Sequence, residues 1–185
     1  MPRRTSSTRQ TRSTNALDLL KTDHATVKKL FKQFEKFKKS EDADGMLETA
    51  RAICNALHVH AQIEEEIFYP ALREAGGADD ALGEANVEHS HVKELVSQLD
   101  QAAPADDLFA ARVKVLSEYV QHHVDEEEST LFSKARKARV DLDALGEQLA
   151  ARKDELEAGQ PPVDMALLAG RSRAAPRRNG QRATR

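Results

Sequence analysis

The sequence lacks most of the residues that build disulfide-linked, sheet-rich or membrane-spanning proteins. Its 185 residues include one cysteine, Cys54, so an intramolecular disulfide is excluded and a reducing, cytoplasmic location is expected. Tryptophan is absent, and valine and isoleucine are too sparse and scattered to favour a sheet. No apolar run approaches the ~20 residues that a membrane-spanning helix needs. We therefore expect no membrane association.

Acidic residues are missing from both ends of the chain. The first fourteen residues carry four arginines and no acid, and the last fifteen carry six arginines and no acid. The overall net charge of −3 therefore conceals a charge of −13 over residues 15–170. We predict that residues 1–14 and 159–185 are disordered basic tails. Such tails could attract nucleic acid or another acidic partner, although the sequence contains no element that reads bases.

The residues that are abundant favour helix. Alanine, leucine, glutamate, lysine and arginine dominate the composition, and all are strong helix formers. We predict five helices, over residues 15–39, 44–74, 79–101, 105–139 and 143–158, with Asn15 as the first N-cap. The connections are only a few residues long, so consecutive helices should be antiparallel neighbours. The expected fold is all-α: a four-helix bundle over residues 15–158 with a short extra C-terminal helix.

Each of the four long predicted helices has an apolar stripe with alternating steps of three and four residues, the spacing of a buried bundle face. Every stripe is interrupted by one histidine, and two stripes also contain a glutamate one turn later. In chain order the stripes are Leu17, Leu20, His24, Val27, Phe31, Phe34; Ile53, Leu57, His60, Glu64, Ile67, Ala71; Leu82, Ala85, His89, Val92, Val96, Leu99; and Phe109, Val113, Leu116, Val120, His123, Glu127, Thr130.

These six interruptions predict a metal site in the core. A glutamate inside a bundle is costly unless its charge is matched, and two of them call for a cation. A lone core histidine is usually a hydrogen-bonded structural residue, but chance is a poor explanation for the same interruption in four stripes. The helical rise also places all six groups at one level of the bundle. The predicted ligands are His24, His60, Glu64, His89, His123 and Glu127.

An internal repeat indicates two metals rather than one. The segment DHATVKKLFKQF (23–34) aligns with EHSHVKELVSQL (88–99), and HAQIEEEIFYP (60–70) aligns with HVDEEESTLFS (123–133). Two helical hairpins related in this way would give each metal two histidines, with both glutamates bridging. Histidine and carboxylate ligands without thiolate favour iron over manganese and argue against structural zinc. Six protein groups leave coordination positions open for dioxygen, peroxide or nitric oxide.

At these residues the sequence resembles the hemerythrin-like HHE cation-binding family, over roughly residues 16–158. The motifs are Asp23-His24, His60 to Glu64 running into Ile67-Phe68-Tyr69-Pro70, Glu88-His89 with Val92-Lys93, and His122-His123-Val124 followed by Glu126-Glu127-Glu128 and Leu131-Phe132. The resemblance implies an up-down-up-down bundle and a di-iron site bridged by carboxylates and by an oxo or hydroxo group.

The chain departs from the oxygen-carrying members of that family in two places. Those proteins have an extra histidine where this sequence has Lys93, and their last acidic ligand is an aspartate five residues after its histidine. Here Glu127 follows His123 by four residues. Iron handling and the sensing of oxygen, redox state or nitric oxide are therefore favoured. The alternatives are an enzyme that acts on hydrogen peroxide (catalase-like) or nitric oxide, and then reversible oxygen binding; an intact ligand set disfavours a vestigial, purely structural bundle.

Several neighbouring residues are assigned plainer roles. The three histidines off the stripes should lie at the surface, and the acidic residues beside the two core glutamates should be solvated, although one of them could hydrogen-bond a ligand histidine. Phe68, Tyr69 and Phe132 should close the core beside the metals, with Tyr69 also a candidate redox or hydrogen-bonding residue. Those assigned to the surface are His58, His91 and His122, and Glu65, Glu66, Glu126 and Glu128.

Overall fold

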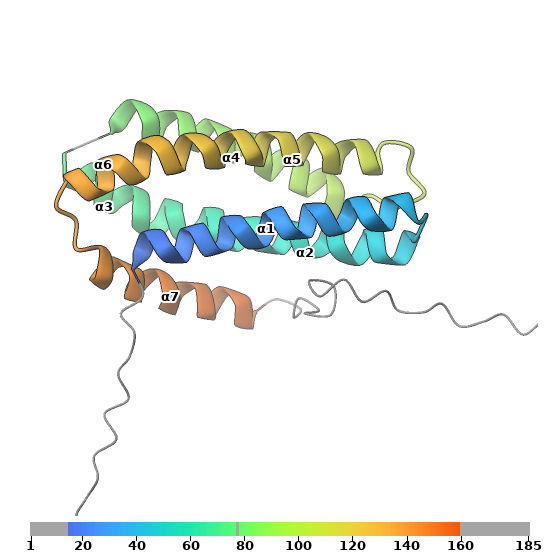
Figure 1. Ribbon diagram of the computed structural model, residues 1–185, viewed down its shortest axis with the longest axis horizontal. Coiled ribbons are helices and arrows are strands. Elements are labelled where there is room, and N and C mark those ends of the chain that lie inside the picture. Colours follow the sequence, from blue (N-terminus) through green and yellow to red (C-terminus); the bar gives the residue numbers. More distant parts are fainter. Residues whose placement is uncertain (1–14, 77, 160–185) are drawn as a thin grey trace, which may run out of the picture.

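The computed structural model describes residues 15–76 and 78–159, which form helices and no strand. The four antiparallel legs of the bundle are α1, then α2 with its continuation α3, then α4, and then α5 with its continuation α6 (Figure 1). Their bounds, with two π-helical turns η1 and η2 and a last helix α7, are α1 Ala16–Lys39, α2 Ala43–Ile63, η1 Glu64–Phe68, α3 Tyr69–Glu74, α4 Asp79–Asp100, α5 Phe109–Glu126, η2 Glu127–Leu131, α6 Phe132–Lys137 and α7 Leu142–Ala158.

The predicted all-α bundle with a short C-terminal helix is confirmed. Helix α7 packs on α1, α2 and η1, so it covers one half of the bundle and leaves the α4–α5 half uncovered (Figure 1). The predicted disordered tails, 1–14 and 159–185, lie outside the described residues except for Gly159. No helix in the described ranges combines the length and the apolar character that crossing a membrane requires.

Side-chain caps fix the starts of α1, α2 and α7. The side chain of Asn15 accepts a hydrogen bond from the Leu17 amide at 3.1 Å, which confirms the predicted N-cap. Asp42 caps α2 in the same way through the amide of Gly45, at 3.0 Å. At Gly45, α2 approaches α1 closely: a Cβ atom built there would lie 2.5 Å from the ring of Phe37. A side chain at this position would separate the two helices.

The predicted start of the fourth leg at residue 105 is wrong. The helix begins at Phe109, because the segment before it forms turns instead. The carboxylate of Asp106 accepts a hydrogen bond from the Leu108 amide at 2.9 Å and another from Arg112 at 2.9 Å. Aspartate commonly competes in this way with the helical backbone.

Two legs predicted as continuous α-helices each contain one π-helical turn. The amide of Tyr69 donates to the carbonyl of Glu64, and the amide of Phe132 donates to that of Glu127, five residues apart in both cases. Each turn inserts one extra residue and moves the buried stripe by one position. The stripe predicted beyond each glutamate is therefore wrong. Phe68 and Leu72 are buried in place of Ile67 and Ala71, and Leu131 is buried in place of Thr130.

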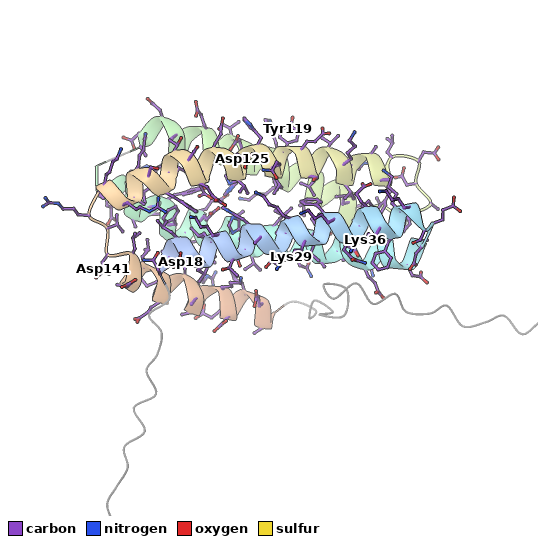
Figure 2. The ribbon with its side chains drawn as sticks, in the orientation of Figure 1. Asp18, Lys29, Lys36, Tyr119, Asp125 and Asp141 are labelled. Atoms are coloured by element: carbon purple, nitrogen blue, oxygen red, sulfur yellow. The ribbon has the colours of Figure 1, made fainter. Side chains whose placement is uncertain are left out.

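The core divides into two apolar clusters with the histidine layer between them. One cluster runs from Val27 toward the α1–α2 and α4–α5 connections, and the other surrounds Phe68 and Phe132 at the end covered by α7. Cys54 is 3% exposed within the first cluster, as expected of a small buried residue, and burial raises the pKa of its thiol to about 12. Charged side chains cover the outside, as Lys29, Lys36 and Asp125 illustrate (Figure 2).

Candidate metal centre

The structure brings all six predicted ligand residues together in one buried layer. None of them is more than 5% exposed. Each leg contributes one histidine, and the two glutamates are the first residues of the two π-helical turns. The six are His24 on α1, His60 on α2, Glu64 on η1, His89 on α4, His123 on α5 and Glu127 on η2.

The six side chains form two groups that share Glu64. The Nε2 atoms of His24 and His60 are 3.0 Å apart, and those of His89 and His123 are 3.2 Å apart. Glu64 reaches both pairs: its Oε1 lies 3.3 Å from Nε2 of His60 and its Oε2 lies 3.4 Å from Nε2 of His89. Glu127 lies between the pairs as well, with Oε2 3.2 Å from His24 and 4.0 Å from His123.

Both groups have the compactness that a cation needs. One group offers ligand atoms from His24, His60, Glu64 and Glu127, and the other from Glu64, His89 and His123, with the atoms of each group within 4.8 Å of one another. Oε1 of Glu64 and both carboxylate oxygens of Glu127 are buried without a hydrogen-bond donor. Buried carboxylates in this state are costly, and cations would relieve the cost. The donor set therefore fits two metal ions.

A ring of outer carboxylates orients the four histidines. Nδ1 of His24 donates to Glu128 at 2.9 Å, Nδ1 of His89 donates to Glu65 at 2.9 Å, and Nδ1 of His123 donates to Glu88 at 2.7 Å. The fourth ring nitrogen, Nδ1 of His60, is 3.7 Å from a carboxylate oxygen of Asp23. A proton held on Nδ1 leaves Nε2 with a free lone pair that points toward the centre.

The ring was only partly predictable. Glu65 and Glu128, each one residue after a core glutamate, belong to the acidic set from which one histidine partner was expected, and both are partners. Asp23 and Glu88 were not predicted as partners. Asp23 immediately precedes His24 but faces His60, and Glu88 immediately precedes His89 but faces His123. Their equivalent positions in the internal repeat were the one feature of the sequence that pointed to this shared role.

The family model of the hemerythrin HHE cation binding domain matches residues 15–135. This chain belongs to the hemerythrin HHE cation-binding family. The resemblance drawn from the sequence motifs is therefore confirmed. The described residues include groups of histidines and glutamates that could hold a metal ion.

Two individual relatives match most of this chain. A DNA nickase from Nostoc sp. is 35% identical over 122 residues, which are 66% of this chain but only 34% of that protein, so the chain spans about a third of its length. An uncharacterized protein of Mycobacterium tuberculosis (strain H37Rv) is 25% identical over 150 residues, covering 80% of this chain and 89% of that one.

A solved structure shows the same fold. The crystal structure of a hemerythrin HHE cation binding domain-containing protein from Mycobacterium kansasii matches with a TM-score of 0.66 at 23% identity. The match covers 84% of this chain and 98% of that chain. At this level of identity the likeness establishes the bundle architecture.

The two central glutamates of this hemerythrin-family site have different proton affinities. Burial, and then the nearby charge of Glu127, raises the pKa of Glu64 well above its usual value. Burial also opposes ionisation of Glu127, but its contact with His24 and the charge of His123 outweigh that effect and lower its pKa. Of the two, Glu64 therefore has the higher proton affinity.

Three of the outer carboxylates, Asp23, Glu65 and Glu88, have pKa values below their usual ones because of their histidine partners. The hydrogen bond from His89, together with the ammonium group of Lys93, lowers the pKa of Glu65 to about 2. Lys93 stands where oxygen-carrying members have a further histidine, and its Nζ lies 2.6 and 2.7 Å from the two oxygens of Glu65. It therefore points outward, to the ring, and not into the centre.

Aromatic rings close the centre on the side of α3 and α6. The ring of Phe132 stacks on His24 and the ring of Tyr69 stacks on His89, which fits the packing role expected for them. The hydroxyl of Tyr69 lies 3.4 Å from Oε2 of Glu64 and 3.4 Å from Nε2 of His89. It is 2% exposed, and burial raises its pKa. Tyr69 is therefore a neutral hydrogen-bond donor at the centre.

A small cavity lies beside the four histidines. It has a volume of about 20 Å³, and its remaining walls are apolar, with Val27, Leu57, Val92, Val120 and Val124 among them. A cavity of this size holds roughly one water molecule. The other three histidines lie outside the layer: His58 and His91 are exposed, and His122 is 64% exposed. The register that would place His122 and Glu126 inside is therefore not the one adopted.

Proposed function

We propose that this chain holds two iron ions through His24, His60, Glu64, His89, His123 and Glu127, and that it serves in iron handling or in sensing oxygen, redox state or nitric oxide. One observation carries the proposal: two buried carboxylates, with no donor to three of their four oxygens, stand between two pairs of facing histidine nitrogens. The absence of any thiolate from the set favours iron over zinc, and manganese is the nearest competitor.

The residues divide the work of the site. The four imidazoles supply neutral Nε2 ligands because their Nδ1 atoms face the outer carboxylates. The two glutamates would supply negative charge to both metal positions, and Tyr69 donates a hydrogen bond to Oε2 of Glu64. Bound iron would add reversible electron transfer toward a small ligand. The 20 Å³ cavity is far too small for an organic substrate, which favours a ligand as small as dioxygen, peroxide or nitric oxide.

Metal content tests the proposal directly. The purified chain is loaded anaerobically with Fe²⁺, freed of excess metal, and assayed by elemental analysis and absorption spectroscopy. We expect two irons per chain in the wild type and a loss of bound iron in Glu64→Gln, with Glu94→Gln on the exposed face of α4 as the control. One tightly bound zinc with no iron uptake would overturn the di-iron assignment, as would full iron retention by Glu64→Gln.

A second candidate function is the breakdown of hydrogen peroxide, and Tyr69 favours it. A buried hydroxyl within 3.4 Å of both a candidate ligand and a central carboxylate is placed to donate a hydrogen bond to a peroxide held at the centre. Oxygen evolution from peroxide by the iron-loaded chain tests this, with Tyr69→Phe expected to retain iron and release oxygen more slowly. If no oxygen is released, the binding and sensing function stands alone. Reversible oxygen binding is disfavoured because Lys93 points away from the centre.

Two further expectations concern the surroundings of the protein. The single buried thiol of Cys54 suits a reducing, cytoplasmic location. The basic tails, outside the described residues, would attract nucleic acid or an acidic partner, and deleting them should remove any salt-sensitive binding to DNA. The nicking activity of the Nostoc relative is not transferred here, because two thirds of that protein has no counterpart in this chain.

A further inference from the structure

A second, surface-exposed cluster of metal-binding side chains lies next to the buried centre. Nε2 of His122 is 3.5 Å from Oε1 of Glu88 and 3.3 Å from Oε1 of Glu126. The three side chains offer ligand atoms that all lie within 4.8 Å of one another. His122 and Glu126 are exposed, whereas Glu88 is 17% exposed and reaches inward. We call these three residues the outer cluster.

A cleft leads from the outer cluster to the buried centre. It has a volume of about 270 Å³ and lies between α4 and η2, on the half of the bundle that α7 does not cover (Figure 1). Its walls include the exposed carboxylates of Glu84 and Glu126 together with the buried His123 and Glu127, and no lysine or arginine is among the described residues that line it. The cleft therefore connects solvent to the metal site, and all the acidic and basic side chains on its described walls, His123 aside, are carboxylates.

The buried end of the cleft is an unpaired carboxylate. Glu127 is 1% exposed, lines the cleft, and has no hydrogen-bond donor on either oxygen. Glu88 connects the two ends: Oε2 accepts the hydrogen bond from Nδ1 of His123, while Oε1 faces His122. A cation bound by the outer cluster would therefore be linked to His123 through the carboxylate of Glu88. An ordinary solvent-exposed acidic face has no such link to a buried site.

The internal repeat shows that the bundle does not require such a cleft. Three of the polar residues of the cleft and the outer cluster have apolar counterparts in the other half, 65 or 63 residues earlier. Glu84, His122 and Glu126 correspond in this way to Leu19, Val59 and Ile63.

Helix α7 seals that other flank. Leu145 and Leu149 of α7 pack into the apolar cluster that contains Ile63. Asp23, the counterpart of Glu88, is paired with Lys153 of α7, so its charge is neutralised. The centre therefore has one closed apolar flank and one open acidic flank.

We propose that the open flank is the route by which divalent cations enter, with Glu88, His122 and Glu126 as a transient Fe²⁺ site and Glu84 adding to the attraction. Oxygen and imidazole ligands suit Fe²⁺, and a cleft lined by one sign of charge raises the local concentration of its counter-ion. The cation then passes along Glu88 to the unpaired carboxylate of Glu127. This inference rests on the proposed di-iron function of the buried centre.

The rate of iron loading tests the route. The iron-free full-length chain is mixed anaerobically with Fe²⁺, and the loss of free ion is followed with a ferrous indicator. The cleft variant is Glu84→Gln/Glu126→Gln, which removes one charge from α4 and one from α5. Its matched control is Glu94→Gln/Glu118→Gln, which removes two exposed charges from the same helices outside the cleft.

We expect the cleft variant to load roughly tenfold more slowly than wild type, at the lower end of electrostatic steering effects, and the control to load at nearly the wild-type rate. Both variants should reach two irons per chain, and high salt should narrow the difference between them. Equal rates for the two variants would overturn the route. A cleft variant that retains only one iron at saturation would also overturn it, because Glu126 would then belong to the permanent site.

A measurement without iron separates this inference from the function on which it rests. Mn²⁺ added below one equivalent should broaden the ring resonances of His122 in the wild type and the control, and leave them sharper in the cleft variant, which keeps His122. If the wild type takes up no iron but this pattern appears, the di-iron function fails and the outer cation site survives. If iron loads fully, and His122 responds equally in all variants, the route fails and the di-iron function stands.

Discussion

Replacing Glu64 by glutamine should stabilise the iron-free chain while abolishing its stabilisation by iron. The carboxyl group is 0% exposed, its one hydrogen bond comes from Tyr69 at 3.4 Å, and it lies beside Glu127. A buried charge costs several kcal/mol, of which protonation and Tyr69 recover a part, so the neutral amide should gain about 1–3 kcal/mol. For a chain of this size, each kcal/mol is worth about 2–4 °C in the melting temperature.

The stability that the iron-free chain gains from Glu64→Gln should depend on pH in a defined direction. Burial raises the pKa of Glu64 in the folded chain above the ordinary value of 4.5 that it has when unfolded. The folded state therefore binds the proton more tightly, and the stability from this group is fully present below pH 4.5. It is lost as the pH rises through the folded pKa. The advantage of Glu64→Gln should therefore be small at acidic pH and grow toward neutral pH.

Thermal melts of four samples test the reasoning: wild type and Glu64→Gln, each with and without iron. Iron bound to the native state should raise the wild-type midpoint, and the rise should be much smaller in the variant. Glu94→Gln, exposed on the same bundle, should change neither midpoint. A lower midpoint for iron-free Glu64→Gln at neutral pH would mean that the carboxylate is a satisfied structural group, and the argument for a cation would fail.

Three further predictions follow from the fold. His123→Ala should remove most bound iron, whereas His122→Ala should keep both ions at saturation, because His122 is 64% exposed; elemental analysis that shows the reverse would place the wrong histidine in the layer. Deleting the residues outside 15–159 should leave iron content and the helical circular dichroism unchanged, and a loss of iron would show that the domain boundaries are wrong. Gly45→Ala should destabilise the chain by about 1–3 kcal/mol in denaturant unfolding, because its Cβ would lie 2.5 Å from the ring of Phe37, and an unchanged midpoint would show that α1 and α2 separate without strain.

The histidine layer was predictable because burial repeats with the helical period. His24 and His89 interrupt apolar stripes that remain α-helical through the whole leg, so the position of each side chain could be counted from its neighbours. The choice of His123 over His122 came from the same counting. All four histidines lie before the π-helical turn of their leg or on a leg without one, so their positions on the buried face were predicted correctly.

The count failed after each glutamate, where the period changes. A π-helical turn leaves no signature in composition, so Thr130 was expected inside although Leu131 is the buried residue. The outer carboxylates Asp23 and Glu88 were not predicted as histidine partners for a different reason. Glu88 bonds His123 and not its chain neighbour His89, and such a pairing depends on how α4 and α5 are placed side by side. Helical periodicity describes one helix at a time and holds no information about that placement.

The two π-helical turns also give the centre an approximate twofold symmetry. They span Glu64–Phe68 and Glu127–Leu131, so they begin and end at the same positions of the 63-residue repeat. Each turn begins at a central glutamate, so the two carboxylates enter the histidine layer from equivalent positions of the two hairpins. Because a π-helical turn shifts the buried face by one residue, the aromatic residue five positions after each glutamate, Tyr69 or Phe132, comes to stack on a histidine of the layer.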